Sequence, residues 1–362
     1  MKKIKIVHID SEKTWRGGQK QVLELVKGLN AKGYENTIVC KKDSELARRA
    51  SNAGINILTL PMKSEFDFFS AWELRKYVRS KKINIIHAHS SHAHTIGLIA
   101  SFRLKTCKLV ITRRVDFHLD NFLSRKIKYG TNVDKIISVS DAIKRVLVED
   151  GIDPGKIITV RSGFVPDILG CAQKDNFFRK SIGISDDKIV VSTVAALAPH
   201  KAHNILLKAA SIVAKKTKDV VFLLAGEGEM RKQLEMSIKN LGLHDTFHLV
   251  GFVENVEKVY SSSDIFAISS EEEGLCTSLF DAMYFGLPIV ATSAGGIPEI
   301  VHDKLNGFIV PVNDFESFAD RILILANNAG KRKKMGEKAS EVLACNSIEN
   351  TIDKTIEVYL GL

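Results

Sequence analysis

The chain has 362 residues, 45% of them apolar, and a formal net charge of +10 from 52 Lys and Arg against 42 Asp and Glu. One hydrophobic core stops growing at roughly 250 to 300 residues, so this length predicts two domains. The positive charge favours anionic partners such as nucleotide sugars, phosphorylated glycolipids or an acidic membrane surface. Nucleic acid is not expected, because no aromatic-rich strand motif, zinc-ligand spacing or helix-turn-helix pattern accompanies the charge.

The cysteines and the apolar runs predict the compartment. The five cysteines are an odd number, lie far apart and form no Cys-x-x-Cys pair. A disulfide framework is therefore not expected, and a reducing compartment is. The N-terminal apolar run is too short for a signal peptide, and no later run reaches the roughly eighteen residues of a membrane span. We expect a cytoplasmic protein that can also lie at the inner face of the membrane.

Strand-like and helical patterns alternate along the whole chain. Strand-like runs cover residues 4–9, 36–40, 55–60, 83–87, 108–112 and 135–139, and then 188–194, 220–225, 246–249, 265–268 and 289–291. Helical patterns between them include residues 19–32 and 141–149 and begin near 205, 229 and 278. This alternation predicts an α/β fold of two doubly wound, Rossmann-like domains that face each other across a cleft. The irregular segment 162–167 predicts the linker, with domains at 1–164 and 165–344.

Polar residues follow several predicted strands, where doubly wound sheets bind ligands. Gly17 and Gly18 open a helix after the first strand, and would let backbone amides approach an anion or simply make a tight turn. His87 and His89 are two apart on a strand and share a face. A metal site is not expected there, because no nearby cysteine or paired carboxylate completes a tetrahedral set.

Arg113 and Arg114 directly follow the fifth predicted strand, and Asp116 lies just beyond them. Arginine cannot act as a base near neutral pH, but it can pair with a phosphate or a carboxylate. A surface arginine pair without a ligand is the alternative.

The segment from residue 271 to 299 is the most informative part of the chain. Glu273 precedes the small-residue turn Gly274, Leu275, Cys276 and Thr277, and an apolar helical pattern follows. We expect Ser278 to cap this helix with Asp281 as its capping-box partner. The free amides of a helix start favour a phosphate, and a carboxylate before the turn can accept hydrogen bonds from sugar hydroxyls. A solvated acidic turn is the alternative.

This segment resembles the signature of the family 4 retaining glycosyltransferases, which have the GT-B fold. Two acids flank seven residues, and Gly-Leu-Pro and Gly-Gly-Ile-Pro-Glu follow. The resemblance implies that Glu273 binds hydroxyls of the transferred sugar and that Asp281 binds the ribose. Asp281 stands where the family has Glu, which shortens the reach by one methylene.

The resemblance extends over nearly the whole chain. Lys201 matches the lysine that clamps the nucleotide diphosphate, whereas Ala196 stands where the family has an arginine. Arg114 stands where members often carry a histidine near the reacting sugar. The family also places a Gly-x-Gly turn near the nucleotide and reads the base with backbone. It packs the last helix, about 345–362, back on the first domain.

These observations predict a retaining glycosyltransferase that uses a UDP- or GDP-linked sugar and a glycan or glycolipid acceptor, in lipopolysaccharide or other cell-envelope synthesis. No metal or other cofactor is expected. A sugar-nucleotide epimerase of the same architecture and a non-catalytic nucleotide-sugar-binding protein are the alternatives. The expected catalytic residues are Glu273, Lys201 and Arg114. The expected donor-binding residues are Gly17, Gly18, Gly226, Gly228, Phe252, Val253, Gly274, Leu275, Cys276, Thr277, Ser278 and Asp281, and the expected acceptor-binding residues are His87, His89, Arg113 and Asp116.

Overall fold

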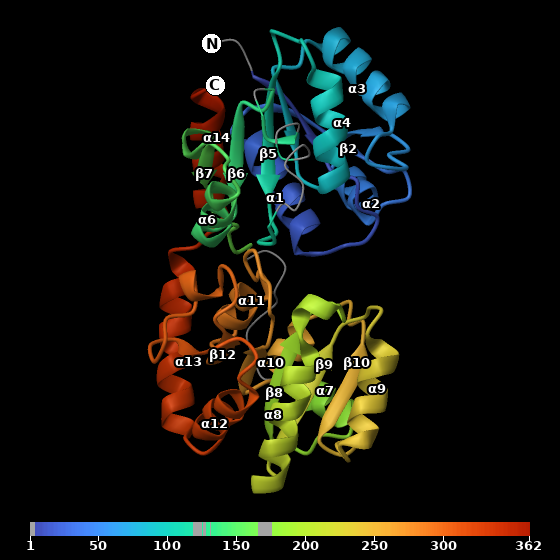
Figure 1. Cartoon of the computed structure of the whole chain (residues 1–362). Helices are drawn as coiled ribbons and strands as arrows, with labels where there is room; N and C mark the ends of the chain where they lie inside the picture. The colour runs from blue at the N-terminus through green and yellow to red at the C-terminus, as the bar shows by residue number, and fades with distance from the viewer. Residues whose placement is uncertain (1–3, 119–124, 126–127, 131, 166–175) are drawn as a thin grey trace. The chain divides into compact units, whose positions relative to one another are not determined.

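The computed structural model describes residues 4–118, 125, 128–130, 132–165 and 176–362. The chain divides into two compact units, of which unit 1 comprises Met1–Gly163 and Ser347–Leu362 and unit 2 comprises Phe164–Asn346 (Figure 1). Residues 162–165 of the predicted linker lie at this division, and residues 166–167 are outside the described residues. Within the described part of the chain, no helix is long and apolar enough to cross a membrane.

Unit 1 is built on a seven-stranded parallel sheet in the order β3-β2-β1-β4-β5-β6-β7. Its strands are β1 (Lys5–Ile9), β2 (Glu35–Cys40), β3 (Asn56–Thr59), β4 (Ile85–Ala88), β5 (Lys108–Arg113), β6 (Lys135–Ser138) and β7 (Ile157–Thr159). Its helices are α1 (Gly17–Ala31), α2 (Glu45–Asn52), α3 (Phe68–Lys81), α4 (Ser91–Ser101), α6 (Asp141–Glu149) and α14 (Ile348–Leu360). The three-residue strand β7 is too short to give a period-two pattern, so the sequence did not predict it.

The C-terminal helix α14 packs on α1 within unit 1. A Cβ at Gly28 would lie 2.1 Å from Cδ1 of Ile352, so glycine is what allows the two helices to approach so closely. Thr351 Oγ1 also donates a hydrogen bond to the carbonyl of Arg161 at 2.8 Å. The last helix of the chain therefore belongs to unit 1, the unit that also contains the first strand.

Unit 2 repeats the scheme with a six-stranded parallel sheet in the order β10-β9-β8-β11-β12-β13. Its strands are β8 (Ile189–Val194), β9 (Val220–Ala225), β10 (Phe247–Gly251), β11 (Ile265–Ile268), β12 (Ile289–Thr292) and β13 (Gly307–Val310). Its helices are α7 (Asn176–Ser181), α8 (His203–Lys216), α9 (Arg231–Asn240), α10 (Glu257–Ser261), α11 (Ser278–Tyr284), α12 (Phe315–Ala326) and α13 (Ala329–Ala344). The sequence pattern did not predict β13.

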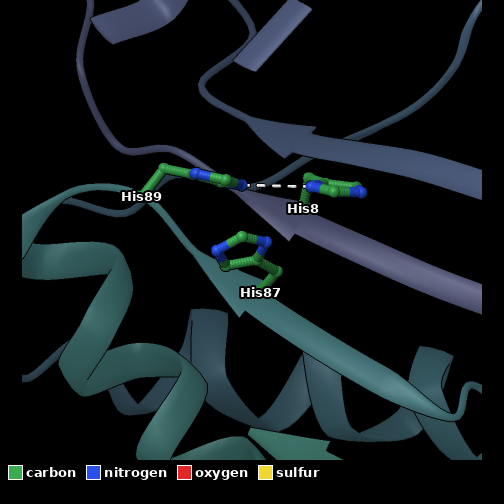
Figure 2. Close-up of side chains that lie close together, drawn as sticks. All are labelled: His8, His87 and His89. Carbon is green, nitrogen blue, oxygen red and sulfur yellow. Dashed lines mark hydrogen bonds between the residues drawn. The ribbon is translucent and has the colours of Figure 1, made fainter. Parts of the chain in front are cut away.

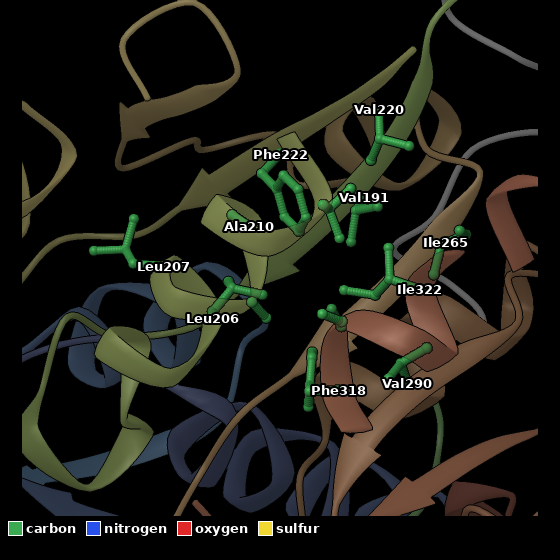
Figure 3. Close-up of a cluster of buried hydrophobic side chains, with 14 of the residues drawn as sticks. Val191, Leu206, Leu207, Ala210, Val220, Phe222, Ile265, Val290, Phe318 and Ile322 are labelled. Carbon is green, nitrogen blue, oxygen red and sulfur yellow. The ribbon is translucent and has the colours of Figure 1, made fainter. Parts of the chain in front are cut away.

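Large apolar side chains fill the core of unit 2 between its sheet and the helices α8 and α12. Phe222 and Val290 project from strands, and Phe318 and Ile322 project from α12 toward them (Figure 3). All four are almost completely buried. Burying such side chains contributes roughly 1.5 to 3 kcal/mol each, so this layer holds the strands in their order.

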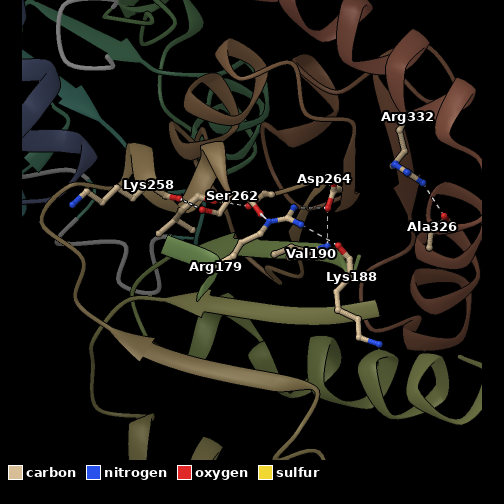
Figure 4. Close-up of polar contacts among 10 residues, drawn as sticks. Arg179, Lys188, Val190, Lys258, Ser262, Asp264, Ala326 and Arg332 are labelled. Carbon is tan, nitrogen blue, oxygen red and sulfur yellow. Dashed lines mark hydrogen bonds and ion pairs between the residues drawn. The ribbon is translucent and has the colours of Figure 1, made fainter. Parts of the chain in front are cut away.

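A buried ion pair joins α7 to two strands of the same sheet. Arg179 Nη2 lies 2.7 Å from Oδ2 of Asp264, which also accepts a hydrogen bond from the Val190 amide at 2.9 Å (Figure 4). Arg179 donates further to the carbonyls of Ser262 and Lys188. Because both charges are paired and hydrogen-bonded, their burial is tolerated, and losing either partner would leave the other uncompensated.

Both sheets share one topology, in which the first strand lies between the second and the fourth. The crossover direction changes between β1 and β4 in unit 1 and between β8 and β11 in unit 2. Doubly wound sheets bind ligands beyond the carboxyl ends of the strands at such a point. The loops after these four strands are therefore the places to look for a site.

Candidate active site

In unit 2, the loops after β8 and β11 bring Lys201 and Glu273 together. Lys201 ends a short 3-10 turn, Pro199–Lys201, and Glu273 follows β11. Lys201 Nζ forms an ion pair with Oε2 of Glu273, and the two side chains are only 15% and 12% exposed. Ser270 Oγ donates to the same carboxylate oxygen at 3.2 Å. Two residues 72 positions apart, each predicted from its own motif, thus form one charged pair.

Backbone contacts hold Lys201 in place. Ala202 has a left-handed backbone with φ of 45°, which is unusual for a residue other than glycine. Ser269 Oγ donates to the carbonyls of Lys201 and Ala202, both at 3.1 Å, and the Glu271 amide donates to the carbonyl of His200 at 2.9 Å. The loop after β11 therefore holds the loop after β8 through the backbone of Lys201 and of the residues on either side of it.

At Ala196, where the family has an arginine, the backbone carbonyl forms a hydrogen bond with a neutral histidine. His203 Nε2 lies 3.0 Å from the carbonyl oxygen of Ala196. Burial lowers the pKa of His203 to about 4, so the ring is neutral at pH 7 and its Nε2 carries the proton that the carbonyl accepts. His203 therefore adds no positive charge beside Ala196.

The glycines of the turn after β9 have a packing reason. A Cβ at Gly226 would lie 1.8 Å from the Ala195 carbonyl oxygen, and one at Gly228 would lie 2.4 Å from that of Leu197. The turn is also tied to its neighbours, because the Gly226 amide donates to the carbonyl of Gly251 at 2.8 Å. Contact of Gly226 and Gly228 with a nucleotide stays a prediction. Their close packing shapes the β8 loop that carries Lys201.

Helix α11 begins at Ser278 as predicted, but the predicted capping arrangement is wrong. The N-cap is Thr277, which already has helical backbone angles, φ −68° and ψ −23°, and makes no side-chain capping bond. Ser278 Oγ instead lies 3.2 Å from Sγ of Cys276. The amides of Leu279 and Phe280 donate to carbonyls within the turn, at 3.1 Å each.

The other residues that the sequence predicts to bind the donor differ widely in exposure. Gly274, Leu275 and Cys276 are buried, and burial raises the pKa of the Cys276 thiol to about 12, so the thiol is neutral. Asp281 is half-buried on α11. Phe252 is 69% exposed beyond β10, with the half-buried Val253 beside it.

In unit 1, Arg114 packs against the start of α1. A Cβ at Gly18 would lie 3.4 Å from Cδ of Arg114, and Gly17 is the first residue of the helix. Arg114 Nη1 donates to Ser162 Oγ at 3.2 Å, and its buried Nε has no hydrogen-bond partner among the described residues. Burial lowers the pKa of Arg114 to about 10, against the attraction of nearby Asp10, so the side chain stays cationic at neutral pH.

Sequence reasoning missed Asp10, which directly follows β1. Its carboxylate accepts hydrogen bonds from the Glu12 amide at 2.9 Å and from Gln19 Nε2 at 3.0 Å. Burial raises the pKa of Asp10. A carboxylate at the end of the first strand is a recognisable signal at this edge of a doubly wound sheet.

The side chain of Arg113 donates hydrogen bonds to the loop that directly follows it. Its guanidinium donates to the carbonyls of Val115 and Phe117, at 3.0 and 2.8 Å, and to the Tyr129 hydroxyl at 3.2 Å. The guanidinium also lies 4.5 Å from the centroid of the Phe117 ring. Asp116 is half-buried in the same loop. Acceptor contact by Arg113 and Asp116 stays a prediction.

Three buried histidines gather where β1 and β4 pair. His8 lies opposite His87 in the sheet, and His89 follows β4 (Figure 2). The ring centroids of His87 and His89 are 4.0 Å apart, and His8 Nδ1 lies 3.0 Å from Nε2 of His89. Burial lowers the pKa of His8 to about 4 and the pKa values of His87 and His89 well below 6.5. The cluster is therefore neutral at pH 7.

The hydrogen bonds assign protons in this cluster. Asn36 Oδ1, 3.1 Å from Nε2 of His8, can only accept, so this nitrogen carries the proton and Nδ1 of His8 accepts from His89. His89 Nδ1 is then a buried lone pair with no partner among the described residues. His87 lies 2.6 Å from the hydroxyls of both Tyr359 and Thr112. A metal ion held by all three rings would have to displace several of these bonds.

Two family models match most of the chain. The model described as "Glycosyltransferase Family 4" matches residues 15–167, and the model described as "Glycosyl transferases group 1" matches residues 174–342. The "UDP-Gal:alpha-D-GlcNAc-diphosphoundecaprenol alpha-1,3-galactosyltransferase" of Escherichia coli is 22% identical over 99% of this chain and 97% of its own length. The "N-acetyl-alpha-D-glucosaminyl L-malate synthase" of Bacillus anthracis is 24% identical over 76% of this chain and 74% of its own length.

Solved structures agree on the fold. A glycosyltransferase from Rickettsia africae superposes with a TM-score of 0.87 at 20% identity, covering 99% of this chain and 98% of the other. HepE from Anabaena, solved in complex with UDP-glucose, superposes with a TM-score of 0.86 at 19% identity, covering 99% and 100%. These likenesses confirm the predicted α/β fold class of the GT-B type.

The two family models and the GT-B fold together define a glycosyltransferase. The chain belongs to the family 4 glycosyltransferases.

Proposed function

We propose that the protein transfers a sugar from a UDP-sugar to a lipid-linked glycan acceptor, with retention of the anomeric configuration. The observation that carries this proposal is the ion pair between Lys201 and Glu273 at the switch point of unit 2. It holds a cation suited to a diphosphate beside a carboxylate suited to sugar hydroxyls, which are the two halves of a sugar nucleotide.

The donor roles fall on unit 2. Lys201 stabilises the departing diphosphate, and Glu273 holds the sugar through its hydroxyls. Asp281 accepts hydrogen bonds from the ribose, and the segment at Phe252 and Val253 contacts the base. Uridine as the base is supported by the names of similar proteins, a UDP-galactose-dependent enzyme of E. coli and HepE bound to UDP-glucose.

In the transfer step, the bond from the anomeric carbon to the diphosphate breaks and a bond to the acceptor oxygen forms on the same face of the sugar. The acceptor proton passes to an oxygen of the leaving diphosphate, so no side-chain nucleophile is required. Lys201 counters the negative charge that grows on the leaving group. The scheme uses no metal ion, since Lys201 compensates the charge of the leaving group.

We assign the acceptor to unit 1. Arg114 is cationic and lies against Gly18 at the edge of the sheet that also carries His89. A guanidinium suits the diphosphate of a lipid-linked acceptor. His89 Nδ1 has no hydrogen-bond partner among the described residues, so it can accept a hydrogen bond from a hydroxyl group of the acceptor substrate. The E. coli relative is named for a diphosphoundecaprenol acceptor, which supports this class of substrate.

Product analysis tests the proposal. The protein is incubated with UDP-, GDP- and ADP-sugars, each with and without a polyprenyl diphosphate-linked sugar. We expect a new lipid-linked glycoside only with a UDP-sugar and acceptor together, and NMR of the product should show the anomeric configuration of the donor. A changed sugar on recovered UDP would instead indicate an epimerase, and binding without any product would indicate a non-catalytic protein.

A further inference from the structure

An aromatic surface covers the outward side of α3 in unit 1. It comprises Phe66, Phe68, Phe69 and Trp72, together with Phe102 at the end of α4, and we call it the α3 surface. Their side chains are between 47% and 67% exposed. They make up five of the eight exposed Phe and Trp side chains in the described part of the chain. Monomeric proteins rarely gather exposed aromatic residues in this way without a partner.

The sequence of α3 places these rings outward because its inner face is already complete. Ser70, Ala71, Leu74 and Val78 are buried and recur at helical spacing. On the opposite side, Phe68, Trp72, Lys76 and Arg79 follow one another at intervals of four, four and three residues. The outward stripe is therefore aromatic over the first half of the helix and basic over the second.

Cations lie directly beside the rings. Arg75 Nη1 donates to the carbonyls of Ala100 and Phe102, at 3.0 and 2.7 Å, which fixes α3 beside α4 (Figure 1). Lys76 Nζ lies 5.4 Å from the centroid of the Trp72 ring. A groove of about 490 Å³ runs along the basic half and is lined by Trp72, Arg75, Lys76, Arg79 and Ser80.

The charge of this region is strongly positive. Residues 63–82 and 102–105 contain eight Lys or Arg and three Asp or Glu. Two of the three acids have partners within unit 1. Glu65 forms an ion pair with Lys128, and Asp67 accepts a hydrogen bond from the Ser70 amide at 3.0 Å. Aromatic rings settle at the headgroup level of a bilayer, and lysine and arginine reach its phosphates, so this combination matches an anionic membrane.

The aromatic end of the surface lies at the carboxyl edge of the unit 1 sheet. A helix that follows a strand of a parallel sheet starts at that edge, and α3 follows β3. Thr95 Oγ1, from α4, donates to Glu65 Oε1 at 2.9 Å beside this end. His89 and Arg114 occupy the same edge of the sheet.

We propose that the α3 surface docks unit 1 on the face of an anionic phospholipid bilayer. The rings enter the headgroup layer, and the basic half of α3 binds lipid phosphates. This proposal goes beyond the proposed glycosyl transfer and is tested without any sugar substrate, so either can fail alone.

Vesicle binding by the full chain tests it, with phosphatidylcholine vesicles that contain or lack about 30% phosphatidylglycerol. One variant carries Phe68→Ser, Phe69→Ser and Trp72→Ser, and another carries Lys76→Glu and Arg79→Glu. The matched controls are Phe177→Ser, at an 84% exposed phenylalanine of unit 2, and Lys333→Glu with Lys334→Glu in α13. We expect the wild type and controls to sediment with anionic vesicles, and both α3 variants to bind at least tenfold more weakly.

Tryptophan fluorescence reports where the chain touches the lipid. Trp15 and Trp72 are the two tryptophans, so Trp15→Phe leaves Trp72 alone. We expect its emission to shift to shorter wavelength with anionic vesicles and to be quenched by brominated lipid. Equal loss of binding in the unit 2 controls, or no binding by the wild type, would overturn the proposal. Reversible dimerisation without vesicle binding would also overturn it and assign the surface to a second copy of the chain.

Discussion

The pairing of Lys201 with Glu273 leads to a prediction that separates two functions of one site. Glu273→Gln keeps the size of the side chain, and its amide oxygen can still accept from Ser270 Oγ. The substitution removes the negative charge that faces Lys201. We expect turnover to fall by about a hundredfold or more, the effect of losing a preorganised electrostatic contact.

Binding of UDP without its sugar should change in the opposite direction. A phosphate on the far side of Lys201 would lie about 6 Å from the Glu273 carboxylate, and the two negative charges repel. Both side chains are slightly exposed, at 15% and 12%, so an effective dielectric constant between protein and water applies. This gives about 1 kcal/mol of repulsion. Its removal should tighten UDP binding about fivefold.

Calorimetry with UDP and turnover with a UDP-sugar measure the two effects on the same protein. Glu272→Gln is the matched control, because Glu272 is an exposed acid in the same turn and its charge is screened by water. Lys201→Ala should nearly abolish UDP binding, and adding Glu273→Gln to it should recover part of the affinity. Weaker UDP binding by Glu273→Gln would refute the opposed roles, and normal donor binding by Lys201→Ala would place the phosphate elsewhere.

Three further predictions test other parts of the molecule. Burial lowers the pKa of His8 to about 4, so the neutral ring contributes its full stabilisation to the folded state above about pH 6.5. This contribution is lost as the pH falls from 6.5 toward 4, because His8 is then protonated in the unfolded chain but not in the folded one. Between pH 8 and 5, the free energy of unfolding should fall by about 2 kcal/mol less in His8→Asn than in the wild type. Urea unfolding monitored by tryptophan fluorescence measures this, because both tryptophans lie in unit 1. Gly226→Ala should lower the free energy of unfolding by about 2 kcal/mol or more, because its methyl group meets the Ala195 carbonyl. Gly242→Ala, at an open site of unit 2 with a positive φ, should cost only about 1 kcal/mol. Urea unfolding followed by circular dichroism measures both variants, because the tryptophans report only unit 1. Asp281→Ala should weaken UDP binding by about 1.5 to 3 kcal/mol in calorimetry, and unchanged affinity would remove Asp281 from the ribose site.

The alternation of strand and helix patterns was enough to predict the fold class. It implied parallel sheets with ligands at their carboxyl edges, and Lys201 and Glu273 lie at that edge of unit 2 because β8 and β11 are neighbours. Each residue came from a separate motif. The sequence alone does not say which strands pair, so their direct contact was not predicted.

The features that the sequence did not predict correctly, or did not predict at all, depend on backbone angles and strand register. A serine followed three residues later by an acid is a capping pattern only if the preceding chain is extended, and Thr277 is already helical. His8 looked like one residue of an apolar strand until its register opposite His87 placed it in a buried cluster. The tight fit of Gly226 against Ala195 likewise depends on two loops that are far apart in sequence.

Because Ala196 stands where the family has an arginine, we expect Lys201 to carry an unusually large share of the contact with the diphosphate. In the β8 loop, residues 195–203, Lys201 is the only lysine or arginine. The nearest histidine to Ala196 cannot substitute, because His203 donates its proton to that carbonyl and burial keeps the ring neutral. Arg113 is committed to its own loop in unit 1. If the diphosphate binds as proposed, Lys201 meets it with little help from its own loop. We propose that Glu273 holds Lys201 in position until the hydroxyls of the bound sugar bind the carboxylate.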